Sequence, residues 1–131
     1  MAIRVILVGC GNMGFAMLKG WLASKALVAE EVSVVEPEQD VRERAARRGV
    51  AVVDSRDGLG ADAPQLVILA VKPQVMGDVA PAYADVARNG ATFVSVAAGI
   101  SVAALEKALG GKDVAVIRCM PNTPAAISQG M

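Results

Sequence analysis

Six short runs of branched aliphatic residues alternate with segments of helical pattern, and this alternation restricts the fold of the chain more than any other feature. The runs cover residues 3–8, 32–36, 50–53, 66–71, 92–96 and 114–119, and the helical segments cover residues 12–24, 38–48, 74–89 and 102–109. Strands and helices in repeated alternation predict an α/β fold, a doubly wound parallel sheet of the Rossmann type. The run at residues 66–71 is apolar at successive positions, which predicts a central strand buried on both faces.

Glycine, proline and serine mark the expected ends of the helices. Gly49 closes the charged helix at residues 38–48, and Pro81 must break or restart the helix at residues 74–89 because proline lacks a backbone N–H. Ser101 is a plausible N-cap for residues 102–109, which two glycines end. The 131 residues are therefore expected to form one domain.

Composition excludes several classes of function. Thirteen basic residues balance thirteen acidic ones, so we expect neither nucleic acid nor an anionic membrane as a partner. The longest apolar run is far shorter than the roughly 20 residues that span a bilayer, and the N-terminus lacks a signal-peptide cleavage site. Two cysteines at strand ends are interpreted as reduced and buried. A cytoplasmic location is expected.

The chain contains no histidine, and this restricts its chemistry. A Ser-His-Asp triad within the chain is excluded, and two distant cysteines cannot build a zinc site, so no metal site is expected. The chemistry is therefore expected to come from an organic cofactor.

The stretch GCGNMG, residues 9–14, is the first candidate site. It joins a strand to a helix, where Gly9 would make the tight turn, Gly11 would admit a pyrophosphate, and Gly14 would let the helix approach the strand. The alternative is a glycine-rich turn without a ligand. Ligands of doubly wound sheets bind beyond the carboxyl ends of the strands, and every unusual cluster in this chain follows a strand. That placement favours a dinucleotide.

Glu36 is the candidate for contact with the ribose. It ends the second strand 22 residues beyond Gly14, where an acidic side chain accepts hydrogen bonds from ribose hydroxyls. A carboxylate there repels a 2′-phosphate, so Glu36 favours NADH over NADPH. Arg42, Arg44 and Arg56 could offset this repulsion, although a solvated helix face or loop is the simpler interpretation of these arginines.

Three further motifs identify a family. AVKPQ at residues 70–74, SVAAGIS at 95–101 and RCMPNTPAA at 118–126, together with GCGNMG, resemble the N-terminal domain of Δ1-pyrroline-5-carboxylate reductase along essentially the whole chain. The glycine turn alone occurs in many reductases. The conjunction of all four motifs, in this order and spacing, is much more specific.

The resemblance implies a set of site residues. The glycine turn would cradle the pyrophosphate, Ala70 to Pro73 would line the nucleotide cleft, and residues 96–98 would lie beside the nicotinamide. The cofactor-binding candidates are Gly9, Cys10, Gly11, Asn12, Met13, Gly14, Glu36, Ala70, Val71, Lys72, Pro73, Val96, Ala97 and Ala98. The catalytic candidates are Lys72 and Asn122. For Lys72 the alternative is a solvated loop lysine, and for Asn122 it is a stiff exit from the last strand.

The sequence also departs from the family's pattern. Family members often carry a small polar residue or arginine where Glu36 and Pro37 stand, which puts the family's usual NADPH preference in doubt. The family continues into a second, helical domain that forms the dimer and much of the substrate pocket. Residues 1–131 are therefore expected to be the dinucleotide-binding domain of a longer protein that forms a homodimer or a higher oligomer.

The expected reaction is NAD(P)H-dependent reduction of 1-pyrroline-5-carboxylate to L-proline, the last step of proline biosynthesis. Two alternatives remain open. One is another two-domain reductase with the same first half, such as a hydroxyacid or F420 dehydrogenase. The other is a non-catalytic module that senses a dinucleotide.

Overall fold

A computed structural model of the chain describes residues 4–55, 58–59, 64–96, 100–111 and 114–118. Its strands are β1 (Val5–Val8), β2 (Val32–Val35), β3 (Ala51–Val53), β4 (Leu66–Leu69), β5 (Thr92–Ser95) and β6 (Ala115–Arg118). Its helices are α1 (Asn12–Ala23), η1 (Ala29–Glu31), α2 (Gln39–Ala46), α3 (Pro73–Val79), η3 (Ala80–Tyr83), α4 (Ala84–Arg88) and α5 (Val102–Ala108).

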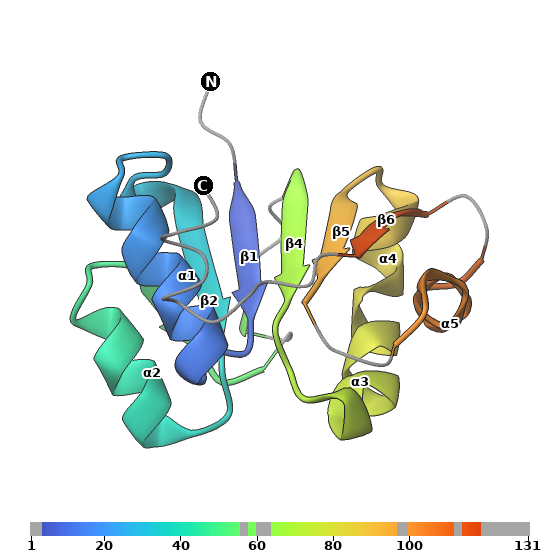
Figure 1. The fold of residues 1–131 in the computed structure, drawn as a ribbon, viewed down its shortest axis with the longest axis horizontal. Helices are drawn as coiled ribbons and strands as arrows, with labels where there is room; N and C mark the ends of the chain where they lie inside the picture. The colour runs from blue at the N-terminus through green and yellow to red at the C-terminus, as the bar shows by residue number, and fades with distance from the viewer. Residues whose placement is uncertain (1–3, 56–57, 60–63, 97–99, 112–113, 119–131) are drawn as a thin grey trace, which may run out of the picture.

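The strands form one parallel sheet in the order β3-β2-β1-β4-β5-β6 (Figure 1). The predicted doubly wound, Rossmann-type α/β fold is therefore confirmed. The chain builds outward from β1 to β3 and then crosses back to place β4 on the other side of β1. The strand order thus reverses between β1 and β4, and this switch point is where such sheets bind ligands.

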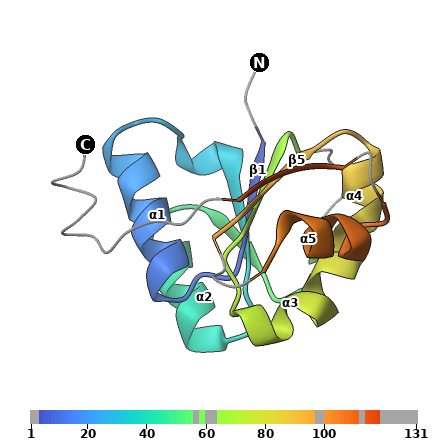
Figure 2. The same ribbon diagram turned by 45° about the vertical axis from the view of Figure 1, so that its right-hand side comes forward.

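Helices cover the two faces of the sheet in separate groups, as the turned view shows (Figure 2). Phe15 and Leu18 of α1 and Ala45 of α2 belong to the hydrophobic core on one face. The other face packs against α3, η3, α4 and α5, through residues such as Met76 and Leu105. β1 and β4 alternate their side chains between the two cores and are buried almost completely, as expected for central strands.

The signals for helix ends act as expected. The Ser101 hydroxyl accepts a hydrogen bond from the Ala104 N–H at 3.0 Å, so Ser101 is the N-cap of α5. Gly49 follows α2 with a φ of +88°, in the left-handed region that favours glycine. The helix predicted at residues 74–89 is divided into α3, η3 and α4, and Pro81 lies in the 3₁₀ turn between the two α-helices.

The observed elements are slightly shorter than the predicted ones. The strand expected at residues 66–71 ends at Leu69, because Lys72 and Pro73 already belong to the start of α3. The helix expected at residues 38–48 covers Gln39–Ala46, with Glu38 as its N-cap. Among the described residues, no helix is long and apolar enough to cross a membrane.

Candidate functional site

The carboxyl ends of five strands lie in one row, because the strands pair in matching register. Val8 in β1 pairs with Val35 in β2 and with Leu69 in β4, and the row continues to Val53 and Ser95. Backbone hydrogen bonds of 2.8–3.2 Å carry the ladder one residue further, at Gly9, Glu36, Ala70 and Val96. The glycine turn, Glu36 and the motifs AVKPQ and SVAAGIS begin at or beside this row, and residues 119–126 of the last motif lie outside the described residues.

The three glycines of residues 9–14 are required for different reasons. Gly9 has a φ of +90°, and a Cβ there would lie 2.9 Å from the Ala70 carbonyl oxygen. A Cβ at Gly14 would fall inside van der Waals contact with the Gly9 carbonyl oxygen. Gly11 has neither constraint, since a Cβ there would meet no atom within 4 Å. Close backbone contacts within the fold require glycine at positions 9 and 14. At Gly11 the missing side chain instead leaves room on the outer surface of the turn.

Helix α1 begins at this turn with its N-terminus unneutralised. Gly11 is the N-cap and has no side chain to cap the helix, and the first turn carries no acidic residue. The first helical hydrogen bond runs from the Phe15 N–H to the Gly11 carbonyl at 2.8 Å. The N–H groups before Phe15 therefore form the positive end of the helix dipole. This arrangement is suited to binding an anion such as phosphate.

Glu36 is buried, with 8% of its surface exposed, and its carboxylate is engaged by the backbone. One oxygen accepts the Cys10 N–H at 2.8 Å and the other accepts the Glu38 N–H at 3.0 Å. The Arg42 guanidinium donates to the carbonyls of Glu36 and Pro37, at 2.9 and 2.8 Å. Glu36 thus ties the glycine turn to the loop that follows β2, a role that the sequence did not indicate.

Cys10 lies fully buried beneath the turn. Burial raises the pKa of its thiol to about 11, the nearby Arg44 guanidinium opposes this, and the Glu36 carboxylate adds to it. The thiol is therefore neutral at physiological pH, and Cys10 contributes to the site through its backbone.

Lys72 and Pro73 turn the chain out of the sheet, as expected from the lack of a ladder donor at proline. Lys72 is the N-cap of α3 in an extended conformation, and Pro73 is the first residue of that helix. Both side chains are exposed, whereas Val71 packs partly against the core. The sequence Ala-Val-Lys-Pro thus connects a buried strand end to the surface helix α3.

A groove of about 680 Å³ opens along this row of strand ends, with residues of α2 and α3 among those that line it. Its volume lies within the range of sites for small molecules and cofactors. Of the predicted site residues it is lined by Gly9, Gly11, Glu36, Ala70, Val71 and Lys72.

The remaining predicted residues lie elsewhere. Cys10, Gly14 and Val96 are buried behind the row, while Asn12, Met13 and Pro73 are exposed at the starts of helices α1 and α3. Ala97, Ala98 and Asn122 lie outside the described residues.

Several lining residues were not anticipated from the sequence. Three of them are the carboxylates Glu38, Asp54 and Asp78, and Tyr83 of η3 is another. Asp54 could have been found, because it directly follows a short strand just as Glu36 does. Asp78 and Tyr83 lie inside helical segments, where only the packing of α3 and η3 against the sheet brings them to the groove.

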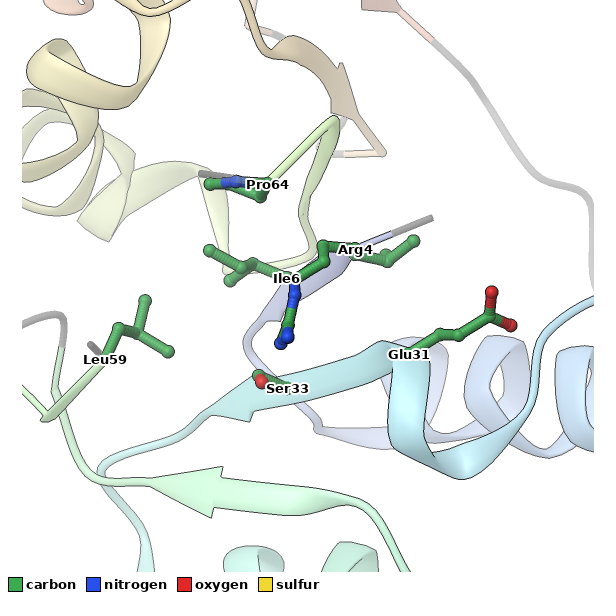
Figure 3. A pocket seen from close by; sticks show the side chains of 7 residues that line it. Arg4, Ile6, Glu31, Ser33, Leu59 and Pro64 are labelled. Carbon is green, nitrogen blue, oxygen red and sulfur yellow. The ribbon is translucent and has the colours of Figure 1, made fainter. Parts of the chain in front are cut away.

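A second, much smaller pocket lies at the amino ends of the strands (Figure 3). It has about 40 Å³ of space and lies between Glu31 at one end and Leu59 at the other. This is room for about one water molecule, so the larger groove is the candidate site for a nucleotide.

Comparison with known proteins identifies the family. A family described as NADP oxidoreductase coenzyme F420-dependent matches residues 4–99, from β1 through β5 and the start of the following loop. The chain belongs to this family. The matched region of the family contains the glycine turn, Glu36 and the β4–α3 connection, and therefore most of the candidate site.

Several curated relatives of the chain are named pyrroline-5-carboxylate reductase. The chain is 40% identical over 128 residues to the pyrroline-5-carboxylate reductase of Pseudomonas aeruginosa, covering 97% of this chain and 46% of that protein. It is 35% identical over 131 residues to the enzyme of the same name from Synechocystis, covering 100% of this chain and 48% of that protein. The resemblance seen in the sequence motifs is thereby confirmed, and the chain spans about half the length of the curated relatives it matches.

Solved structures agree on the fold. A pyrroline-5-carboxylate reductase from Coxiella burnetii superposes with a TM-score of 0.86 at 27% identity, covering 97% of this chain and 47% of that one. A Plasmodium falciparum pyrroline carboxylate reductase with NADP bound has a TM-score of 0.79 at 22% identity, covering 95% of this chain and 44% of that one, a likeness that shows the fold.

The close contact between Gly14 and Gly9 predicts that Gly14→Ala destabilises the domain by about 2 kcal/mol, because α1 must move away from the turn. Gly20→Ala in the same helix is the matched control, since its Cβ meets no atom within 4 Å. We expect it to stabilise by roughly 0.5–1 kcal/mol through helix propensity. Urea unfolding of the two variants measures both effects, and equal stability of the two would contradict the packing described at Gly14.

Proposed function

We propose that residues 1–131 are the dinucleotide-binding domain of a pyrroline-5-carboxylate reductase. The observation that carries the proposal is the groove at the switch point, where a glycine turn and the free N-terminus of α1 meet the row of strand ends. Such a site suits the pyrophosphate of a nicotinamide dinucleotide. The names of the curated relatives supply the substrate class, 1-pyrroline-5-carboxylate.

The bound NAD(P)H supplies the hydride that reduces the C=N carbon of the imine to give L-proline. The chain's own contribution is to bind and orient. The N–H groups at the start of α1 hold the pyrophosphate, and Ala70, Val71, Lys72 and Pro73 support the nucleotide along the β4–α3 connection. Val96, Ala97 and Ala98 are proposed to lie beside the nicotinamide. A protonated cyclic imine is already a strong electrophile, so orientation matters more than a strong acid.

Lys72 and Asn122 are the proposed residues for contact with reacting groups. Lys72 is exposed at the rim of the groove, where its ammonium group can approach an anionic ligand. Among the described residues that line the groove it is the one cation, against the carboxylates of Glu36, Glu38, Asp54 and Asp78. Its charge is therefore available to a carboxylate or phosphate of a ligand at the start of α3.

The acidic lining also bears on the choice of dinucleotide. Glu36, Glu38 and Asp54 lie where β2 and β3 end, the region in which doubly wound folds hold the adenosine ribose. A 2′-phosphate there would face three carboxylates. At 4 Å and an effective dielectric constant near 20, one pair of like charges costs about 4 kcal/mol before screening by salt. We therefore propose a preference for NADH, in contrast to the NADPH preference implied by the family resemblance.

The wider biology follows from the same proposal. The proposed substrate is a small molecule. Neither nucleic acid nor a membrane is a proposed partner, because the numbers of acidic and basic residues in the chain are equal. The longer protein is proposed to be a cytoplasmic homodimer or higher oligomer, assembled through a helical domain. The name of the matched family also keeps a dehydrogenase of the F420 type as a second candidate.

Gly11→Val should abolish binding of NADH while leaving the domain folded. The added side chain meets no protein atom within 4 Å, yet it occupies the side of the turn that faces the groove. Fluorescence titration with NADH is expected to show an affinity at least 100-fold weaker than that of the unmodified chain. Gly20→Val is the control, because the same side chain is added to α1 in open space. Unchanged affinity in a folded Gly11→Val variant would refute the assignment of the turn.

NADH should bind more tightly than NADPH, and Glu38→Lys should reverse or remove this order. We expect the affinity for NADPH to rise tenfold or more in the variant, and the affinity for NADH to change less than threefold, because only NADPH carries the 2′-phosphate. Asp78→Lys adds the same charge from α3 and should leave the ratio of the two affinities nearly unchanged. The proposed preference is wrong if the unmodified chain binds NADPH more than tenfold more tightly than NADH.

A polypeptide of these 131 residues should bind NADH but reduce 1-pyrroline-5-carboxylate negligibly. The family resemblance places much of the imine pocket in the helical domain, and orientation of the reactants can be worth on the order of 7–11 kcal/mol of barrier. A chimera should restore turnover, with residues 1–131 replacing the matching half of the Pseudomonas aeruginosa relative. The rate of NAD(P)H oxidation in the presence of the imine measures the turnover of the polypeptide and of the chimera.

The same assay separates the alternatives. A chimera that binds NADH without turnover favours the sensing module. Turnover of hydroxy acids in place of the imine favours the other dehydrogenases. Comparable activity of the 131-residue polypeptide and the chimera would contradict the two-domain account.

A further inference from the structure

The peptide groups on either side of Cys10 are held by charged side chains from outside the glycine turn. The Cys10 N–H donates to the Glu36 carboxylate at 2.8 Å, from the end of β2. The Cys10 carbonyl accepts a hydrogen bond from the guanidinium of Arg44, in the last turn of α2, at 3.3 Å. The middle residue of the G-C-G sequence is therefore fixed from both sides by residues 26 and 34 positions away.

Arg44 combines contacts that stabilise the fold with a buried donor that has no partner among the described residues. Its guanidinium stacks on the Phe15 ring, 4.1 Å from the centroid, and its Nε–H is buried without a hydrogen-bond partner in the part of the chain that the structure describes. A buried donor without a partner costs stability. A methionine of similar length would cover Phe15 without that cost, but it would lose the cation–π contact with the ring and the hydrogen bond to the Cys10 carbonyl. The hydrogen bond is the part of this arrangement that reaches the glycine turn.

That hydrogen bond sets the direction of the next N–H. In a planar trans peptide the carbonyl and the following N–H point in opposite directions, and the described backbone contains no cis peptide. Because the Arg44 guanidinium donates to the Cys10 carbonyl, the Gly11 N–H on the other side of that peptide points away from Arg44. Gly11 lines the groove, whereas Arg44 does not.

We propose that Arg44 is a positioning residue that aims the Gly11 N–H at a phosphate group in the groove. The proposal rests on the dinucleotide binding proposed above and assigns Arg44 no contact with the ligand. Glu36 has the complementary role of holding the Cys10 N–H, so that Gly11 and the first residues of α1 present the donors to the phosphate. Affinity for NADH and for NADPH then depends on Arg44 to the same extent.

The chain supplies a matched control for removal of a charge. Arg48, two residues after the end of α2, also approaches Phe15, with its guanidinium 5.4 Å from the ring centroid. The Lys19 ammonium of α1 lies 5.3 Å from the same centroid. Neither makes a hydrogen bond to the glycine turn among the described residues. Arg48→Met therefore removes one positive charge near the turn without removing a bond to it, whereas Arg44→Met removes both.

The test compares Arg44→Met, Arg44→Lys and Arg48→Met by fluorescence titration with NADH and NADPH and by thermal unfolding. Arg44→Met should weaken both affinities five- to tenfold, with their ratio changed less than twofold. It should shift the Tm by less than about 5 °C, because relief of the unpaired donor offsets the lost cation–π contact and hydrogen bond. Arg44→Lys should be intermediate, and Arg48→Met should stay within twofold of the unmodified chain. In ¹⁵N NMR spectra, Arg44→Met should reduce the NADH-induced shift of the Gly11 amide by at least half, and Arg48→Met should preserve it.

The outcomes separate this inference from the proposed function. No binding of either nucleotide by the unmodified chain defeats the dinucleotide proposal itself. Binding by the unmodified chain together with equal affinity in Arg44→Met, or an equal loss in Arg48→Met, overturns the role of Arg44. A Tm lowered by more than about 5 °C, or failure of Arg44→Met to fold, would show a purely structural role and would also overturn it.

Discussion

The close approach of the glycine turn to the end of β4 is the contact on which the rest of the site depends. Gly9 adopts a φ of +90° directly against the Ala70 carbonyl, and Gly14 lies directly against Gly9. At the switch point the backbone of the glycine turn therefore packs directly against the backbone at the end of β4, and no Cβ separates the two segments. Because the turn is so tight, α1 begins close to the carboxyl end of β1, and its N-cap Gly11 lines the groove.

The matching register of the strands gives this contact its consequences. Since β1, β2 and β4 end at paired residues, the loops that follow them start at one level and surround a single groove. A slip of one residue in a parallel strand would exchange its two faces, and the alternation between the two hydrophobic cores prevents it. Packing on both faces of the sheet thus specifies the geometry of the site, and core residues such as Val8, Val35 and Tyr83 also line it.

The sequence was sufficient to predict the fold and the position of the groove. Both depend on the order of strands and helices along the chain, and this order does not depend on individual side-chain contacts. Alternating runs predict the parallel sheet, and the glycines, Pro73 and Ser101 mark real ends of elements. The particular contacts of Glu36 could not be predicted. Spacing places an acid at the end of β2, but the rotamer that turns it toward Cys10 is decided by burial and by the N–H groups within reach.

The same limit applies to residues brought to the site from helices. Arg44 reads as one of several charges on an exposed helix, and only the packing of α2 beside α1 places its guanidinium between Phe15 and the Cys10 carbonyl. Asp78 of α3 and Tyr83 of η3 reach the groove through the packing of these two elements against the sheet. The positions of these side chains are determined by long-range packing between elements, which local sequence propensity does not reveal.

The burial of Glu36 changes how selectivity for the nucleotide has to be understood. A carboxylate whose two oxygens already accept backbone N–H groups has fewer lone pairs left for ribose hydroxyls, and its charge is partly balanced by those donors. Its first effect is then on the shape of the glycine turn, which both dinucleotides share. Under the proposed preference for NADH, discrimination at the 2′ position would depend more on the exposed carboxylates of Glu38 and Asp54, which accept no hydrogen bond among those described. The proposal thus separates the buried acid that shapes the turn from the exposed acids that would face a 2′-phosphate, and substitutions at the two kinds of position should have different effects.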